Sequence, residues 1–372
     1  MKEKYRPSEL MNAQNIIVLF AVLLVQQVFA QRNQTDSVKI DYKKTGAYSL
    51  DGNVTPALNI LEHYDITKLS QEDLKFKTEF ENRFSYKEDK SDFLESRKSP
   101  IAELLKIYVS YWHLSLIDNS KIYDTLLIQN ITKFLTTNYQ PAHKLTANKD
   151  SIDFYEKKYI NSLGLYTTGF GKTGKYFDLL VWKTEKDTTY SFNMNNEKTS
   201  ANVVFMDNFI TIGWEEYATL GRAYPGGWAT TEALYCVRSA YDLNSEDFMV
   251  NYLAHESRHF TDYKLFPKLM SADLEYRAEL TQLCMAQTTL YRIIGGFINN
   301  ANYESENGHS VADYCIIRDL SKILFKVEFE KDMNKWKKIS VKQINKTAGD
   351  LLKANTQALK KQGIGVENYI KK

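Results

Sequence analysis

The sequence predicts an α+β protein in which two helical regions flank an antiparallel sheet. Hydrophobic residues make up 43% of the 372-residue chain and charged residues 25%, the usual balance of a globular protein. With only 16 glycines and 6 prolines, the composition favours helices over a loop-rich β architecture. Apolar residues recur at helical spacing before residue 139 and after residue 245, and short β-branched and aromatic runs lie between these stretches.

Residues 1–30 predict a secretory signal peptide. Residues 16–25 form an uninterrupted run of ten apolar residues, too short for a bilayer-spanning helix of about 20 residues. Basic residues precede the run, and Val28 and Ala30 supply the small side chains that a signal peptidase accepts. We therefore expect cleavage after Ala30 and export to a periplasmic or extracellular compartment, with no membrane-spanning segment in the mature chain. The alternative is a buried core helix.

Residues 31–150 predict an N-terminal helical region that begins with a flexible stretch. Residues 31–50 are polar and show no apolar periodicity. Beyond them, apolar residues return every three or four positions, which is the spacing of a helix with one buried face. The predicted helices span residues 74–84, 101–117 and 122–135.

A sheet is expected over residues 159–240, the first part of a unit that spans 151–330. Its segments are short and rich in β-branched and aromatic residues, with glycine or polar residues between them. Within it, residues 169–175 (GFGKTGK) nearly match a phosphate-binding loop, but Tyr176 stands where such a loop needs a serine or threonine. A glycine-rich hairpin is the better interpretation.

Helical periodicity returns over residues 245–330 and continues into a lysine-rich tail at 331–372. Asn244 or Ser245 can cap the first of these helices, because short polar side chains accept hydrogen bonds from the first turn. We interpret the tail as a helix with a solvated basic face. A contact with a membrane surface or an acidic partner is the alternative.

The charge and cysteine content exclude some partners and scaffolds. The chain has 48 basic and 46 acidic residues, so it lacks the basic surplus that nucleic-acid binding requires. Three cysteines are too few, and odd in number, for a disulfide scaffold. We interpret Cys236, Cys284 and Cys315 as structural residues, and a bridge between one pair remains open in an exported protein.

Residues 255–259 read His-Glu-Ser-Arg-His, an H-E-x-x-H motif. Residues four apart lie on one face of a helix, so His255 and His259 can direct two imidazoles at one metal ion, as zinc sites require. Glu256 can then take a proton from a zinc-bound water. Since the chain holds only six histidines, a chance match is uncommon. The alternative is two solvated histidines on a helix surface.

Two glutamates downstream can complete the site. A catalytic zinc ion normally has three protein ligands and one open position. Glu275 and Glu279 lie one turn apart on the next predicted helix, which can fold back antiparallel to the motif helix after Pro267. One carboxylate can reach the metal while the other accepts the ring N–H of a ligating histidine. The alternative is a pair of surface charges near Arg277.

The combination of H-E-x-x-H with E-x-x-x-E on the following helix resembles the gluzincin zinc metallopeptidases. The resemblance covers residues 226–320 and implies a zincin-like unit at 151–330, one catalytic Zn²⁺ and cleavage of peptide bonds. It implies that Glu279 supports a ligating histidine, and it implies three zinc ligands: His255, His259 and Glu275. The spacing of some thermolysin-like members would instead make Glu279 the third ligand, but Leu283, four residues later, cannot support a histidine.

Two weaker features accompany the resemblance. Gly226, Gly227 and Trp228 precede the motif at about the distance where gluzincins place the sheet edge that binds the substrate backbone. A tight turn with a core tryptophan is an equally good interpretation. Gluzincins often use a histidine or tyrosine after the third ligand to stabilise the oxyanion, and His309 and Tyr303 are the candidates.

These features together predict an exported zinc hydrolase that cleaves peptide or related amide bonds in a peptide or protein substrate, with Glu256 as the general base. Two other classes stay open, namely a catalytically silent, zinc-stabilised binding protein on the same fold and a secreted module without metal. The remaining histidines have no partner by pattern and are interpreted as structural: His63, His113 and His143.

Overall fold

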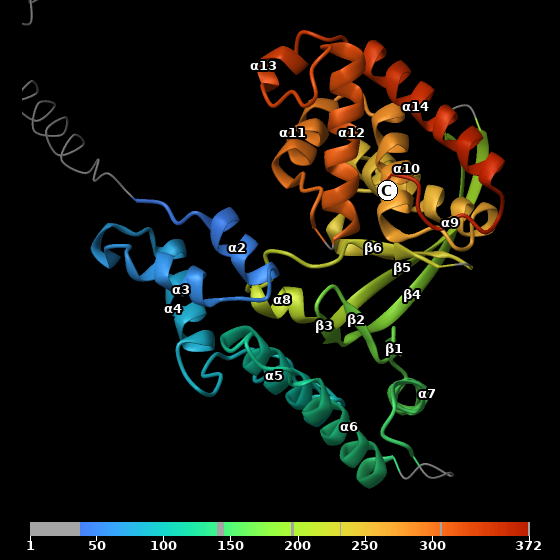
Figure 1. Cartoon of the computed structure of the whole chain (residues 1–372). Coiled ribbons are helices and arrows are strands. Elements are labelled where there is room, and N and C mark those ends of the chain that lie inside the picture. Colours follow the sequence, from blue (N-terminus) through green and yellow to red (C-terminus); the bar gives the residue numbers. More distant parts are fainter. Residues whose placement is uncertain (1–37, 140–144, 195–196, 231, 306, 371–372) are drawn as a thin grey trace, which may run out of the picture. The chain divides into compact units, whose positions relative to one another are not determined.

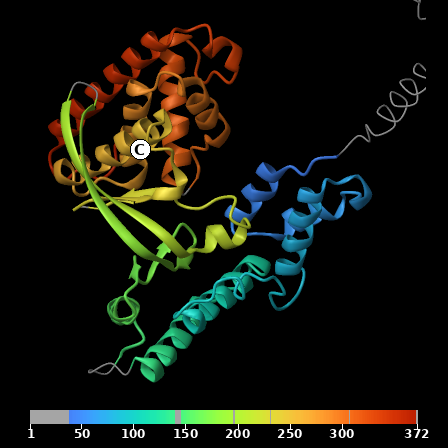
Figure 2. The same ribbon diagram turned by 180° about the vertical axis from the view of Figure 1, so that it is seen from behind.

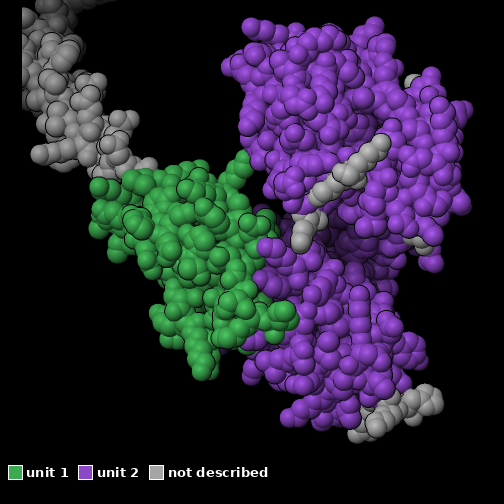
Figure 3. Space-filling model, in the orientation of Figure 1, with its two compact units in different colours: residues 1–92, 113–122, 218–220 green, residues 93–112, 123–217, 221–372 purple. Residues whose placement is uncertain are grey.

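A computed structural model describes most of the chain, which is a helix-rich α+β protein. The described residues are 38–139, 145–194, 197–230, 232–305 and 307–370. They form two compact units, coloured separately in Figure 3. Unit 1 takes in the described residues up to 92 together with 113–122 and 218–220, and unit 2 holds the rest. The predicted signal peptide and His143 lie outside the described residues.

Unit 1 is helical and is built around a row of packed aromatic rings. Its helices are α2 (Tyr42–Leu50), α3 (Thr55–Glu62), α4 (Gln71–Phe84) and the end of α5 (Ala102–Ile117), with a 3₁₀ turn at Ile66–Lys68. Successive ring centroids lie 4.8 to 6.3 Å apart along Tyr42, Phe76, Phe80, Phe84 and His113. His113 is buried in this row, in agreement with a structural role.

Helix α2 corrects the expectation of a flexible start for residues 42–50, whereas residues 31–37 of that stretch lie outside the described residues. The Asp41 carboxylate accepts the Lys44 N–H at 2.9 Å and so caps the helix. Tyr42 packs edge-on against Phe76 of α4. The sequence of α2 shows no apolar periodicity, so the helix could not be predicted from it. Its contact with α4 stabilises it instead.

Unit 2 contains a five-stranded sheet of order β1-β4-β5-β7-β6. Its strands are β1 (Tyr166–Thr167), β4 (Leu180–Met194), β5 (Glu197–Ile212), β6 (Gly227–Ala229) and β7 (Leu234–Val237). All neighbours pair antiparallel except β5 and β7, which are parallel. The sheet begins at Tyr166 rather than at 159, because α7 (Lys149–Ser162) occupies the start of the predicted range.

Several sequence predictions in the first half of the chain are confirmed. Helices form at α4, α5 and α6 (Asp124–Asn138), as the apolar periodicity indicates. The glycine-rich segment 169–175 enters a hairpin of β2 (Gly171–Thr173) and β3 (Tyr176–Asp178). Helix α8 (Trp214–Ala218) follows β5.

The helices after β7 lie together on one side of the sheet (Figures 1 and 2). They are a π-helix (Asp247–Ala254), α9 (His255–Leu265), α10 (Ser271–Met285), α11 (Leu290–Asn300), α12 (Gly308–Leu324), α13 (Met333–Trp336) and α14 (Val341–Gln362). Helix α10 packs against α9, α12 and α14 and is therefore buried on nearly every side. The lysine-rich tail is α13, α14 and a short end segment.

The described residues also decide two smaller points. Cys236, Cys284 and Cys315 are all free thiols, so the bridge left open by the sequence does not form. Among the helices described, none has the length and apolarity needed to cross a bilayer.

Candidate metal centre

The motif helix begins with a π-helix that anchors it to the sheet. Ser245 Oγ accepts the Phe248 N–H at 3.1 Å, as the capping prediction expected. Phe248 and Tyr252 pack on buried residues of β5 and β7. The wider π-helical turn ends at Ala254, and ordinary α-helical spacing starts at His255.

Three ligand atoms converge where α9 faces α10. His255 Nε2 lies 3.0 Å from His259 Nε2, and Glu275 Oε2 lies 3.2 and 3.4 Å from these nitrogens. The group that contains both motif histidines therefore includes Glu275 and not Glu279. All three side chains are largely buried.

The donor set fits a zinc ion. Bonds of about 2.0–2.2 Å in a tetrahedral site leave neighbouring ligand atoms about 3.3 Å apart, close to the three observed separations. Glu275 Oε2 is buried and accepts no hydrogen bond. Two imidazoles and a carboxylate are also the ligands of many catalytic zinc sites. In this arrangement the pKa of Glu275 is lowered, because its close contacts with His255 and His259 outweigh the effect of burial.

No fourth side-chain ligand joins this group within the described residues. His309 reaches Glu275 but does not lie within 4.8 Å of both motif histidines, so it belongs to a separate cluster. A structural zinc site is normally closed by four protein ligands, whereas a catalytic site leaves one position open. The donor set therefore has the composition of a catalytic site.

Glu256 lies beside the centre without a partner of its own. Within the described residues its half-buried carboxylate makes no ion pair or hydrogen bond. Burial raises the pKa of three nearby phenols, and the charge of Glu256 raises it further. These are Tyr241, Tyr252 and Tyr263. The three phenols therefore stay neutral near the Glu256 carboxylate.

Glu279 lies beside His309 rather than beside a motif histidine. Its Oε1 is 3.1 Å from His309 Nδ1, whereas Nδ1 of both His255 and His259 lacks a hydrogen-bond partner. The expectation that Glu279 receives the ring N–H of a zinc ligand is therefore wrong. Glu279 does follow Glu275 by one helical turn, but the imidazole that its carboxylate contacts is that of His309 on α12.

A second buried carboxyl group stands behind Glu279. Asp313 of α12 accepts a hydrogen bond from Asn300 Nδ2 at 2.6 Å. Burial raises the pKa of Asp313 to about 7, and it raises the pKa of Glu279 well above its usual range, with a further contribution from the charge of Asp313.

Tyr263 is a residue of the centre that the sequence analysis missed. Its ring stacks on His259 with centroids 6.2 Å apart and planes 16° apart. Besides burial, the charges of Glu256 and Glu275 raise its pKa. The sequence spacing could have indicated this residue, because Tyr263 is four residues after His259 and so lies on the same helix face.

The glycine pair has a packing explanation. A Cβ at Gly226 would lie 2.4 Å from the Tyr241 hydroxyl, and one at Gly227 would lie 2.3 Å from the Tyr235 carbonyl. Trp228 stacks on Tyr235 with centroids 5.6 Å apart. Residues 227–229 nevertheless form β6, which ends the sheet order and contacts α9.

Tyr303 takes part in a different environment. It packs against Tyr314 in the core formed by the C-terminal helices. His309 belongs to a cluster of possible metal ligands, whereas Tyr303 packs against the helical core. Of the two oxyanion candidates, His309 is thus the one that the structure brings to the acidic side of the centre.

The helices that carry the ligands are tied together near one end by a buried ion pair. Arg277 of α10 donates to both oxygens of Asp262 of α9, at 2.6 and 2.9 Å, and both side chains are 0% exposed. The same guanidinium donates to Asn355 Oδ1 and Thr356 Oγ1 of α14. These bonds hold three helices at fixed spacing below the centre.

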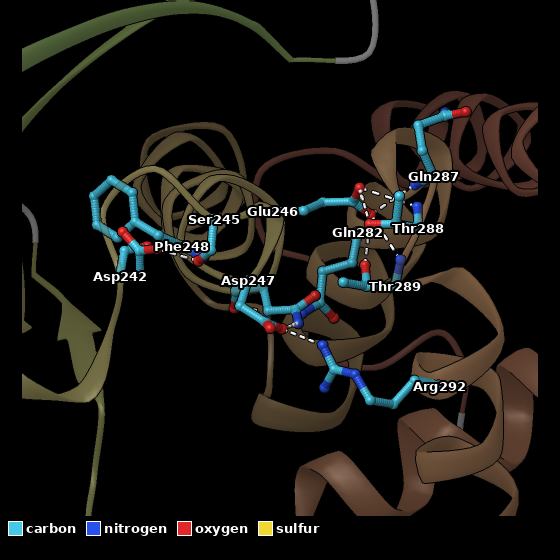
Figure 4. Close-up of polar contacts among 11 residues, drawn as sticks. Asp242, Ser245, Glu246, Asp247, Phe248, Gln282, Gln287, Thr288, Thr289 and Arg292 are labelled. Carbon is cyan, nitrogen blue, oxygen red and sulfur yellow. Dashed lines mark hydrogen bonds and ion pairs between the residues drawn. The ribbon is translucent and has the colours of Figure 1, made fainter. Parts of the chain in front are cut away.

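The other tie is made by Glu246, just before the π-helix (Figure 4). Its carboxylate accepts the backbone N–H groups of Gln287, Thr288 and Thr289 at 2.7–3.0 Å, and the hydroxyl groups of both threonines. Burial opposes the charge, but these donors outweigh it and lower the pKa of Glu246 to about 2. The start of the motif segment is thereby fixed to the turn after α10.

Comparison with known proteins gives no relative: no protein-family model, no curated protein and no solved structure matches the chain. Conclusions about function therefore depend on the geometry of the centre.

Proposed function

We propose that this chain is a zinc-dependent hydrolase of peptide or related amide bonds, of gluzincin type. The observation that carries the proposal is the convergence of His255 Nε2, His259 Nε2 and Glu275 Oε2 within 3.4 Å, with no fourth side-chain ligand among the described residues. A bound zinc ion would supply Lewis acidity and would lower the pKa of a water in its open position toward about 7.

The surrounding residues have complementary roles in this proposal. Glu256, unpaired beside the ligands, accepts the proton of the attacking water and returns it to the leaving amine. Tyr263 and His309 are the candidate hydrogen-bond donors to the negative charge that develops on the carbonyl oxygen. Strand β6 ends the sheet beside α9 and can pair with the backbone of an extended peptide.

Glu256→Gln tests the role of the base. The substitution keeps the shape of the side chain but removes its basicity, so zinc content should stay at the wild-type level while kcat on a peptide substrate falls about 10²–10⁴-fold. Zinc content is measured by elemental analysis and hydrolysis with a fluorogenic peptide library. Glu304→Gln, an exposed glutamate outside the centre, is the matched control.

Two results would contradict the proposal. If Glu256→Gln hydrolyses peptides as fast as the wild type, Glu256 is not the base. If the wild-type chain binds zinc tightly but cleaves no peptide in the library, the chain is better described as a zinc-stabilised binding protein.

We also propose that the chain acts after export. The proposal is supported by the signal-peptide pattern of residues 1–30. N-terminal sequencing of the mature protein from an expressing cell should begin at Gln31, and an intact N-terminus would contradict it.

A further inference from the structure

A second group of ligand atoms lies against the first and shares Glu275. His309 Nδ1 is 3.2 Å from Glu275 Oε2 and 3.1 Å from Glu279 Oε1. One ligand atom from each of the three side chains lies within 4.8 Å of the others. The three residues come from α10 and α12, which pack directly against each other.

Glu279 lies beside His309 but has no lysine or arginine partner among the described residues. Glu279 and Asp313 are each 3% exposed, and neither forms an ion pair with a lysine or arginine in the described chain. Glu279 Oε2 and Asp313 Oδ1 are buried and accept no hydrogen bond. A buried carboxylate is costly unless a cation or several donors balance it.

Asp262, another buried acid on the neighbouring helix, shows how a carboxylate is balanced elsewhere in unit 2. Asp262 is 0% exposed, and Arg277 balances it with two hydrogen bonds. Arg277 and Glu279 stand two residues apart on α10, yet the carboxylate of Glu279 faces an imidazole and a second carboxylate instead. The side of α10 that carries Glu275 and Glu279 thus brings carboxyl groups together where, among the described residues, imidazoles reach them but no lysine or arginine does.

We propose that Glu275, Glu279 and His309 form a second divalent-cation site beside the zinc site, and that Glu275 belongs to both. Two carboxylates and one imidazole suit first-row divalent ions such as Zn²⁺ or Mn²⁺. Asp313 of α12 stands behind Glu279. The proposal rests on the proposed zinc site because the two share a ligand.

His309 keeps its other role in this arrangement. The nitrogen that faces the carboxylates is Nδ1, so a neutral ring that binds a cation there carries its proton on Nε2. The side chain is 53% exposed, so that N–H can still meet a substrate.

The test is metal stoichiometry of the full chain. Purified wild type, dialysed against Zn²⁺, should bind two equivalents by elemental analysis and calorimetry. Glu279→Gln and His309→Ala should each bind one, and Glu304→Gln should bind two as the matched control. With Mn²⁺ in place of Zn²⁺, wild type should give the electron paramagnetic resonance spectrum of a coupled pair, and Glu279→Gln that of an isolated ion.

The outcomes separate the two proposals. One equivalent in the wild type overturns the second site and leaves the zinc hydrolase standing, and the buried acids then share a proton. No bound metal overturns both. If Glu279→Gln and His309→Ala both still bind two equivalents of metal, the second ion binds elsewhere and the proposed second site is overturned. If Glu279→Gln does not fold, His309→Ala still decides, because that side chain is half exposed.

Discussion

Tyr263 lies on the same helix face as the motif histidines, although it is not part of the motif. The pattern H-E-x-x-H ends at His259, but the helix face continues for another turn. Tyr263 lies on that face, stacked on His259 and close to Glu256.

Tyr263→Phe removes only the hydroxyl group. If it stabilises the oxyanion, kcat should fall about 10²–10³-fold while KM and zinc content change little. Steady-state kinetics and elemental analysis on the same preparation give both values. Tyr314→Phe, which alters a tyrosine of the helical core, serves as the control. An unchanged kcat would remove Tyr263 from the mechanism.

At the level of elements, α9 and α10 act as a pair because buried polar bonds join them. Each carries part of the ligand set, and neither holds its position by apolar packing alone. Arg277 joins them close to the ligands, and Glu246 joins the start of the motif segment to the turn after α10. The separation of the ligand atoms therefore depends on these two ties.

Arg277→Ala should destabilise the chain by about 3–5 kcal/mol, because it leaves the Asp262 carboxylate buried without a partner. The free energy of unfolding in urea measures the loss. Arg292→Ala removes an exposed pair with Asp247 and should cost at most about 1 kcal/mol. Equal losses in the two variants would contradict the structural role of Arg277.

Glu246→Gln should lower stability in a pH-dependent way. Since folding lowers the pKa of Glu246 from 4.5 to about 2, its charge stabilises the fold above about pH 4.5, and this contribution disappears as the pH falls toward 2. We expect a gap of about 1–2 kcal/mol at pH 7, kept small because the carboxylate is half exposed. Urea unfolding at several pH values should show the gap closing in acid, and a constant gap would contradict the assignment.

The elements that could be predicted well from the sequence are those determined by residues close together in the chain. Helices α4, α5 and α6 show a regular apolar spacing, and the hairpin of β2 and β3 contains its turn glycines. The motif histidines share a face because the helical period requires it. Contacts far apart in sequence were not predictable, such as the parallel pairing of β5 with β7 and the burial of α2 against Phe76.

The same distinction holds inside the centre. Spacing offered both Glu275 and Glu279 as the third ligand, and the family resemblance favoured Glu275. The partner of Glu279 could not be predicted, because His309 comes from α12, thirty residues later. The π-helix is likewise invisible in the apolar pattern, since its wider turn is stabilised by packing on the sheet.

For the molecule as a whole, metal binding should stabilise unit 2. All five tryptophans of the chain lie in unit 2, so their fluorescence reports on the unit that holds both ligand clusters. A metal present at about 100 times its Kd stabilises a fold by about 2.7 kcal/mol. A chelator should therefore lower the melting temperature seen by tryptophan fluorescence by several degrees.

Glu275→Ala provides the control for this measurement. The variant lacks the shared ligand, so its fluorescence melting temperature should be the same with and without the chelator. A chelator effect of wild-type size in this variant would show that the metal binds elsewhere.

The position of Glu275 between two clusters has a genetic consequence. One carboxylate contacts both motif histidines and His309, so its loss removes every neighbour's function at once. In a Glu275→Ala background, changes at Glu279 or His309 should add nothing further, because residues in one network do not act additively. In the proposed sites Glu275 is thus epistatic to Glu279 and His309, so a variant that lacks Glu275 reveals nothing about the separate roles of those two neighbours.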